Sequence, residues 1–100
     1  MHKIAFVVPT KDRENDLRTM LASLEQQTQK PDQIIVVDGS DPNISHVVDE
    51  FQDLSIDYLK VFPPGLSKQR NAGMARLREE ITLAGYLDDD LVLEPDAVEN

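Results

Sequence analysis

Three consecutive carboxylates, Asp88, Asp89 and Asp90, are the side chains of this sequence best suited to chemistry. Apolar residues lead into the run and follow it, which is typical of the end of a buried strand. Adjacent like charges repel unless a cation or strong hydrogen-bond donors face them. A hard divalent ion prefers oxygen ligands, and ligands of open α/β sheets bind beyond the carboxyl ends of strands. The run therefore indicates a metal site, with a solvated acidic turn as the alternative.

A second and a third polar cluster each follow an apolar segment that reads as a strand. Thr10, Asp12 and Arg13 come after the first such segment, and Asp38 and Ser40 come after the second. An acidic residue just past a strand can accept hydrogen bonds from a ribose or a base. For Asp12 the alternative is capping of the helix that follows, and for Asp38 it is an Asx turn around the next glycine.

A fourth cluster is cationic and lies near the start of a predicted helix. Lys68 and Arg70 fall in its first turn, where outward-pointing backbone N–H groups also attract an anion. Asn71 offers both a donor and an acceptor. A metal ion at Asp88 and Asp90, opposed by a cation near Arg70, would bracket a diphosphate. The alternative is that these side chains form the solvated face of a helix.

The elements that must position these clusters alternate between strand and helix. Strands begin about every thirty residues, the spacing of βαβ units, whose right-handed crossovers give a parallel sheet between helices. We predict strands at 4–8, 34–37, 56–62 and 82–87. Helices are predicted within 14–28 and 44–51, and a third helix is predicted to begin at an N-cap, Ser67. Its inner face would consist of Ala72, Ala75, Leu77 and Ile81. The fold class is three-layer α/β/α and Rossmann-like, with about four mainly parallel strands. Because parallel strands end at one edge, the polar clusters should converge there.

Composition narrows the class of protein. The 100 residues fit one domain, and the net charge of −9 argues against nucleic acid as a partner, whose phosphates would be repelled. The chain has no cysteine, which excludes thiolate chemistry. The apolar run 4–9 is too short for a signal sequence or a membrane span, so we expect a cytoplasmic protein. Association of a longer parent with the inner face of a membrane stays open.

Four segments of the chain, in order, resemble family 2 glycosyltransferases of the GT-A fold. They are 7–13 (VVPTKDR), 34–40 (IIVVDGS), 68–73 (KQRNAG) and 87–90 (LDDD), the last followed by Pro95. Each motif alone is weak, whereas four in the order of the family are specific. The resemblance covers essentially the whole chain and implies that residues 1–100 are a single domain, the N-terminal nucleotide-sugar-binding half of a longer enzyme.

The resemblance also implies a role for each candidate residue. Pro9, Thr10, Asp12, Arg13 and Ser40 would line the nucleotide pocket, Asp38 would contact the base, usually uracil, and Arg70 and Asn71 would lie near the ribose and diphosphate. The Asp88-x-Asp90 pair would be the DXD motif: Asp90, with Asp88, would bind Mn²⁺ or Mg²⁺, and Asp88 or Asp89 would lie nearer the sugar nucleotide.

The implied function is inverting transfer of a sugar from a nucleotide-diphospho-sugar, with UDP as the expected nucleotide, to an acceptor hydroxyl. The family often has two acidic residues before the Gly-Ser pair, whereas here only Asp38 precedes it. In the family the acceptor site and the general base lie beyond the segment that corresponds to residue 100, so we expect no catalytic residue within this chain and no turnover by it alone.

Two other classes of protein compete with an enzyme. One is a regulatory module that binds a nucleotide or a metal ion without processing it. The other is a receiver-like domain, which needs acidic residues after its first strand and a phosphoacceptor after its third; Pro9-Thr10 and Pro63-Pro64 stand there instead. We also expect that a free sheet edge would let the chain self-associate.

Overall fold

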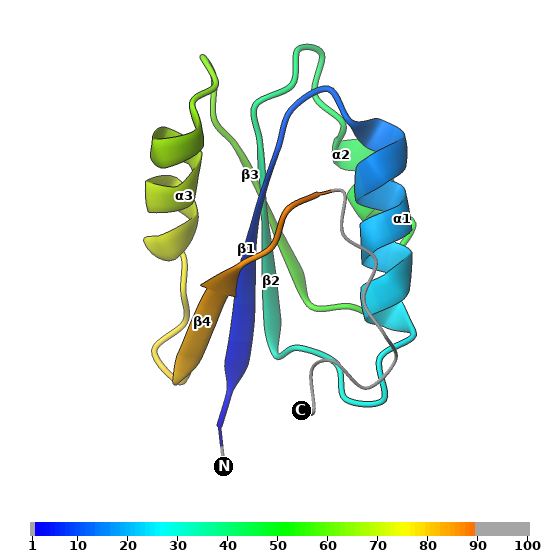
Figure 1. Ribbon diagram of the computed structural model, residues 1–100, viewed down its shortest axis with the longest axis vertical. Helices are drawn as coiled ribbons and strands as arrows, with labels where there is room; N and C mark the ends of the chain where they lie inside the picture. Colours follow the sequence, from blue (N-terminus) through cyan, green and yellow to red (C-terminus); the bar gives the residue numbers. More distant parts are fainter. Residues whose placement is uncertain (1, 90–100) are drawn as a thin grey trace.

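The computed structural model describes residues 2–89 of the chain, which form a four-stranded sheet between two layers of helices (Figure 1). All strand pairs are parallel, in the order β3-β2-β1-β4. The elements in chain order are β1 (Ile4–Thr10), α1 (Glu14–Glu25), β2 (Gln33–Asp38), α2 (Ser45–Val48), β3 (Ile56–Lys60), α3 (Leu66–Met74) and β4 (Leu83–Tyr86). The three-layer, Rossmann-like prediction is therefore confirmed.

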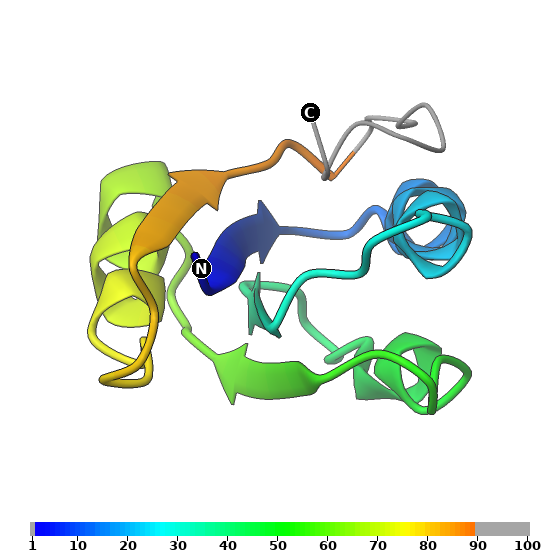
Figure 2. The same ribbon diagram turned by 90° about the horizontal axis from the view of Figure 1, so that it is seen from below.

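Alternation along the central strands builds a separate core on each face of the sheet. Val8, Ile34 and Val36 pack with the apolar side chains of α1 and α2, while Val7, Ile35 and Val37 form the core beneath α3. Figure 2 shows α3 alone on one side of the sheet and the other two helices on the opposite side. Since successive side chains of a strand point to opposite faces, a strand covered on both faces must be apolar throughout.

Helix α3 is held unusually close to the sheet at Gly73. A Cβ atom built on this glycine would lie 2.3 Å from Cγ1 of Val7 and 3.0 Å from Cγ2 of Val37. Only a residue without a side chain lets the helix backbone approach the two central strands this closely. This contact fixes the height of the last turn of α3 above the sheet.

The boundaries of several elements differ from those predicted. The first strand continues past Val8 to Thr10, because its backbone stays paired with β2 as far as the Thr10–Asp38 pair. Helix α3 begins at Leu66, with Gly65 at the N-cap position and no side-chain cap, so the predicted Ser67 cap is wrong. The helix ends at Met74, so Ala75 and Ile81 do not lie on it, although Ala72 and Leu77 do pack against the core.

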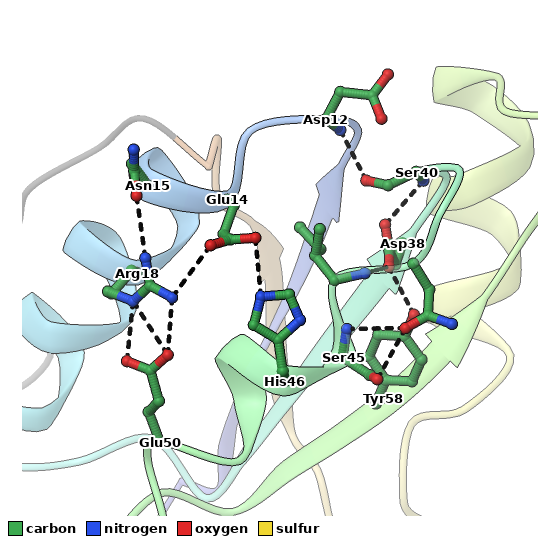
Figure 3. Close-up of polar contacts among 12 residues, drawn as sticks. Asp12, Glu14, Asn15, Arg18, Asp38, Ser40, Ser45, His46, Glu50 and Tyr58 are labelled. Carbon is green, nitrogen blue, oxygen red and sulfur yellow. Dashed lines mark hydrogen bonds and ion pairs between the residues drawn. The ribbon is translucent and has the colours of Figure 1, made fainter.

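A surface ion network ties α2 to α1 on the far side of the sheet from α3 (Figure 3). Arg18 on α1 donates to Glu50 at 2.8 Å and to Glu14 at 3.3 Å, and His46 on α2 contacts Glu14 at 2.8 Å. These groups are partly exposed, so the network contributes little stability of its own. Its effect is to anchor the short helix that follows the β2 loop. No helix among residues 2–89 is long and apolar enough to cross a bilayer.

Candidate functional site: a pocket at the carboxyl edge of the sheet

A pocket of about 500 Å³ opens at the edge where the parallel strands end. Its walls come from the β1–α1 loop, the β3–α3 loop with the start of α3, and the segment after β4. The lining residues are Pro9, Thr10, Lys11, Arg13, Pro64, Gly65, Leu66, Gln69, Asp88 and Asp89. The polar clusters after the first and fourth strands thus meet in one cavity, as the topology predicted.

Asp89 joins the two strands that flank the pocket. Its Oδ2 accepts a hydrogen bond from the Thr10 hydroxyl at 2.8 Å, and its Oδ1 lies 3.4 Å from Nη1 of Arg13. The residue is only 6% exposed. A hydroxyl donor and a guanidinium therefore compensate this buried carboxylate, which is what burial of a charge requires. Asp88, next to it, is exposed and faces the pocket.

Gln69, in the first turn of α3, connects the helix to the ends of two strands. Its Nε2 donates to the carbonyl oxygens of Thr10, at 3.0 Å, and Val37, at 2.9 Å, and its Oε1 accepts from the N–H of Gly65 at 3.2 Å. The side chain is 4% exposed. Because each polar atom of a buried amide needs a partner, this one amide sets the position of the pocket floor relative to α3.

Asp38 is fully buried at the end of β2, and its carboxylate already has protein partners (Figure 3). Oδ1 accepts from the Ser40 N–H at 2.8 Å, and Oδ2 accepts from the Ile44 N–H at 2.8 Å and the Tyr58 hydroxyl at 2.6 Å. Burial alone would raise the pKa of Asp38, but these hydrogen bonds outweigh it and lower the pKa below its ordinary value. The alternative of an Asx turn around Gly39 is therefore observed.

Tyr58, which donates one of these hydrogen bonds to Asp38, also has a shifted pKa. Burial, together with donation to the Asp38 carboxylate, raises the pKa of Tyr58, so this phenol stays protonated as a donor. The predicted contact of Asp38 with a base is not tested by these internal contacts and stays a prediction.

Asp12 adopts a left-handed backbone conformation with φ of 55°. Its N–H donates to the hydroxyl of the buried Ser40 at 2.7 Å, and its own carboxylate points outward, away from that bond (Figure 3). The following helix has Arg13 at its N-cap position and no side-chain cap, so Asp12 does not cap it. Asp12 and Ser40 thus lie outside the pocket lining, whereas the two neighbours of Asp12, Lys11 and Arg13, belong to it.

Arg70 and Asn71 lie on α3 outside the pocket lining. The Arg70 guanidinium carbon is 4.9 Å from the centre of the Tyr86 ring, and its buried Nε has no hydrogen-bond partner within residues 2–89. Asn71 is exposed. Arg70 therefore reaches toward β4 and the segment that carries the acidic run, while Asn71 does not join the site described by these residues.

The predicted metal ligands are only partly described. Asp90 lies outside residues 2–89, and within that range no three carboxylate or imidazole side chains gather as a metal-binding group. Asp88 is exposed, lines the pocket and offers carboxylate oxygens, and its role as a metal ligand stays a prediction.

Five residues of the pocket lining are not among the predicted site residues: Lys11, Pro64, Gly65, Leu66 and Gln69. The rule that ligands bind beyond the carboxyl ends of strands points to Pro64 and Gly65 as well, since they follow the third strand. The sequence gives no such signal for Gln69, because its side chain acts by donating to backbone carbonyls of β1 and β2, which are far from it in the chain.

Comparison with known proteins places the chain in a family. The model of the family "Glycosyl transferase family 2" matches residues 5–100. The chain belongs to glycosyl transferase family 2. Among characterised relatives it is similar to glycosyltransferase GlyA of Streptococcus pneumoniae, with 35% identity over 97% of this chain and 14% of GlyA.

Solved structures with a similar fold include TarS of S. aureus, with a TM-score of 0.85, 20% identity, and coverage of 97% of this chain and 18% of that one. A shorter TarS chain in complex with UDP gives a TM-score of 0.85 at 21% identity, covering 97% and 30% of the two chains. A TarS complex with UDP-GlcNAc gives 0.74 at 24% identity, covering 88% and 26%. The chain thus spans less than a third of the length of each of these relatives.

Proposed function

We propose that this chain is the donor-binding part of an inverting glycosyltransferase that takes its sugar from a nucleotide diphosphate, with UDP as the nucleotide. The observation that carries the proposal is the pocket at the carboxyl edge, where cationic, apolar and acidic walls meet. Membership of family 2 and the UDP and UDP-GlcNAc complexes of TarS support the choice of reaction and of donor.

The chemistry of the pocket walls fits the parts of such a donor. Pro9, Pro64 and Leu66 offer apolar surface for a base and a ribose face, and Lys11 and Arg13 offer positive charge for a diphosphate. Asp88 lines the same pocket, so a donor bound there would meet both the cationic side chains and this carboxylate.

Asp88 and Asp90 would hold the divalent ion, Mn²⁺ or Mg²⁺. When bound, such an ion supplies Lewis-acid stabilisation of the charge that develops on the departing diphosphate. Asp89 does not need to share this task, because it holds the two sides of the pocket together through Thr10 and Arg13.

The acceptor site and the base that activates the acceptor hydroxyl are proposed to lie in the rest of a longer protein, so that residues 1–100 bind the donor without transferring its sugar. A hydroxyl is a weak nucleophile at neutral pH, which is why a base is needed. A cytoplasmic location is part of the same proposal, since nucleotide sugars are the substrates.

Titration of UDP into the full-length protein, with and without Mn²⁺, tests the proposal. We expect UDP to bind and to bind more tightly with the metal ion, whereas absence of UDP binding under both conditions would refute it. Sugar transfer from UDP-GlcNAc to water or to an acceptor would then separate an enzyme from a regulatory module that only binds the nucleotide.

A further inference from the structure

The β1–α1 loop carries two residues of the pocket lining on either side of a backbone conformation that is unfavourable for most residues. Lys11 and Arg13 line the pocket, and Asp12 between them has a φ of 55°. A residue other than glycine in this region is uncommon and persists where its surroundings hold it. The contacts of Asp12 therefore decide whether the two cationic side chains point into the pocket.

The contact that holds Asp12 comes from a neighbouring loop. The hydroxyl of Ser40, on the loop after β2, accepts the N–H of Asp12 at 2.7 Å. Ser40 is fully buried and the bond is partly buried, so water competes for it less than for a bond on the surface. The Gly39 N–H donates to the Thr10 carbonyl at 2.9 Å, so backbone hydrogen bonding between β1 and β2 continues up to the residue before Ser40.

Ser40 is held in turn by the carboxylate of Asp38. The Ser40 N–H donates to Oδ1 of Asp38, and the hydroxyl of Tyr58, on β3, donates to Oδ2 at 2.6 Å. Figure 3 shows these groups in a line from β3 to the β1–α1 loop, with Tyr58, Asp38, Ser40 and Asp12 in that order. Tyr58 is partly buried and Ser40 is fully buried, and neither lines the pocket. Both thus support the β1–α1 loop, which does line it.

We propose that Ser40 and Tyr58 are positioning residues of the donor site. Ser40 holds Asp12 left-handed through its hydroxyl, and Tyr58 supports Ser40 through Asp38, so that Lys11 and Arg13 are presented to the diphosphate. The proposal rests on the proposed function for the identity of the ligand. The arrangement of the loop itself does not depend on that identity.

The test compares Ser40→Ala with the wild type in the full-length protein. Without the hydroxyl, Asp12 loses its acceptor and the loop gains alternatives, so UDP should bind about tenfold more weakly. Trypsin, which cleaves after lysine and arginine, should cut after Lys11 and Arg13 several times faster, and mass spectrometry locates those cuts. Circular dichroism must show the same folded structure, so that the faster cleavage reports on the loop.

Ser45→Ala is the matched control, because the Ser45 hydroxyl bonds to Asn43 on the exposed surface nearby, outside this chain of contacts. It should leave both UDP affinity and cleavage unchanged. Tyr58→Phe is a second variant, should Ser40→Ala not fold. It removes only the hydroxyl that supports Asp38, so the same two effects are expected at smaller size.

The outcomes separate the two proposals. If wild-type protein does not bind UDP, the proposed function fails, but cleavage after Lys11 and Arg13 still tests the loop without any ligand. If the wild type binds UDP and Ser40→Ala and Tyr58→Phe match it in affinity and in cleavage, the positioning role is wrong. Weaker UDP binding with unchanged cleavage would also overturn it, because Ser40 would then act by some route other than holding the loop.

Discussion

Asp38 and Asp89 are both buried carboxylates at the carboxyl edge of the sheet, yet their partners give them different tasks. Asp38 accepts from uncharged donors, which include two backbone N–H groups of the following loop and the Tyr58 hydroxyl of β3. Asp89, which lines the pocket, contacts the Thr10 hydroxyl and the Arg13 guanidinium directly. The first therefore organises a loop, and the second connects the walls of a cavity.

Replacement of Asp38 by asparagine should destabilise the fold in a pH-dependent way. An amide keeps only one acceptor oxygen, so its NH2 group faces the N–H of either Ser40 or Ile44, which should lower the free energy of unfolding at pH 7 by about 2–4 kcal/mol. The pKa of Asp38 is lowered in the folded protein from its ordinary value of 3.8. Its stabilisation is thus fully present above that value and is lost as the pH falls through the folded pKa.

Urea denaturation at pH 7 and at successively lower pH measures this effect. The difference between wild type and Asp38→Asn should shrink as the pH falls below 3.8. The exposed Asp53 provides a control, since Asp53→Asn should change little at any pH. A constant difference across the titration would show that the Asp38 carboxylate is not the source of the stability.

Asp90 is the residue on which the metal prediction depends most. Asp90→Ala should abolish the part of the UDP affinity that requires Mn²⁺ while leaving the fold intact, because it removes one of the two carboxylates proposed to hold the ion. Isothermal titration with and without Mn²⁺ measures this, with Asp53→Ala as the control. An unchanged metal dependence in Asp90→Ala would remove Asp90 from the ligand set.

At the scale of single elements, α3 is the one whose placement most affects the pocket. Its first turn contributes Leu66 and Gln69 to the lining, and Gln69 fastens it to the ends of β1 and β2. Its other end is fixed by the close contact of Gly73 with the sheet. Two contacts about one turn apart therefore set both the height and the tilt of the helix.

Gly73→Ala should be strongly destabilising in spite of the better helix propensity of alanine. The new Cβ would lie 2.3 Å from Val7, on a central strand that cannot move without disturbing both cores. We expect a loss of about 1–3 kcal/mol in the free energy of unfolding, as for overpacked cores, measured by urea denaturation.

Gly65→Ala is the matched control for this prediction. A Cβ atom at Gly65 would find its nearest neighbour, Cβ of Lys68, at 3.7 Å, which is ordinary van der Waals contact. Its stability should therefore be close to that of the wild type. Equal stability of Gly73→Ala and Gly65→Ala would mean that α3 shifts freely on the sheet.

At the scale of the whole molecule, the sheet has one edge with exposed apolar side chains. The strand order places β4 at an edge, with β1 as its only partner within residues 2–89. Leu83 and Tyr86 on this strand are 48% and 44% exposed. A free strand edge with apolar side chains is a template for pairing with another chain.

The 100-residue chain, produced by itself, should therefore self-associate through β4. Light scattering at increasing concentration should show a rising average mass, and Leu83→Lys should suppress the rise, since an edge lysine resists pairing. Leu66→Lys, at an exposed leucine away from this strand, should leave the association as it is. A strictly monomeric wild-type chain that binds no apolar dye would contradict the prediction.

The sequence by itself determined the class of fold and the region of the site. Apolar runs at the spacing of βαβ units allow few topologies, and parallel strands must end at one edge, so Thr10 and Asp89 could be expected to meet. Four motifs in order also sufficed to indicate the family, which the match over residues 5–100 establishes.

Only the tertiary structure decided which polar residues face the pocket and which stand behind it. Asp12 and Asp38 are both aspartates near the carboxyl end of a strand, yet one is exposed and left-handed and the other is buried with its oxygens occupied. Local sequence cannot separate them, because the difference comes from partners distant in the chain: Tyr58, 20 residues from Asp38, and Ser40, 28 residues from Asp12. Partners brought together by folding, rather than residue type, determine whether a carboxylate is available to a ligand.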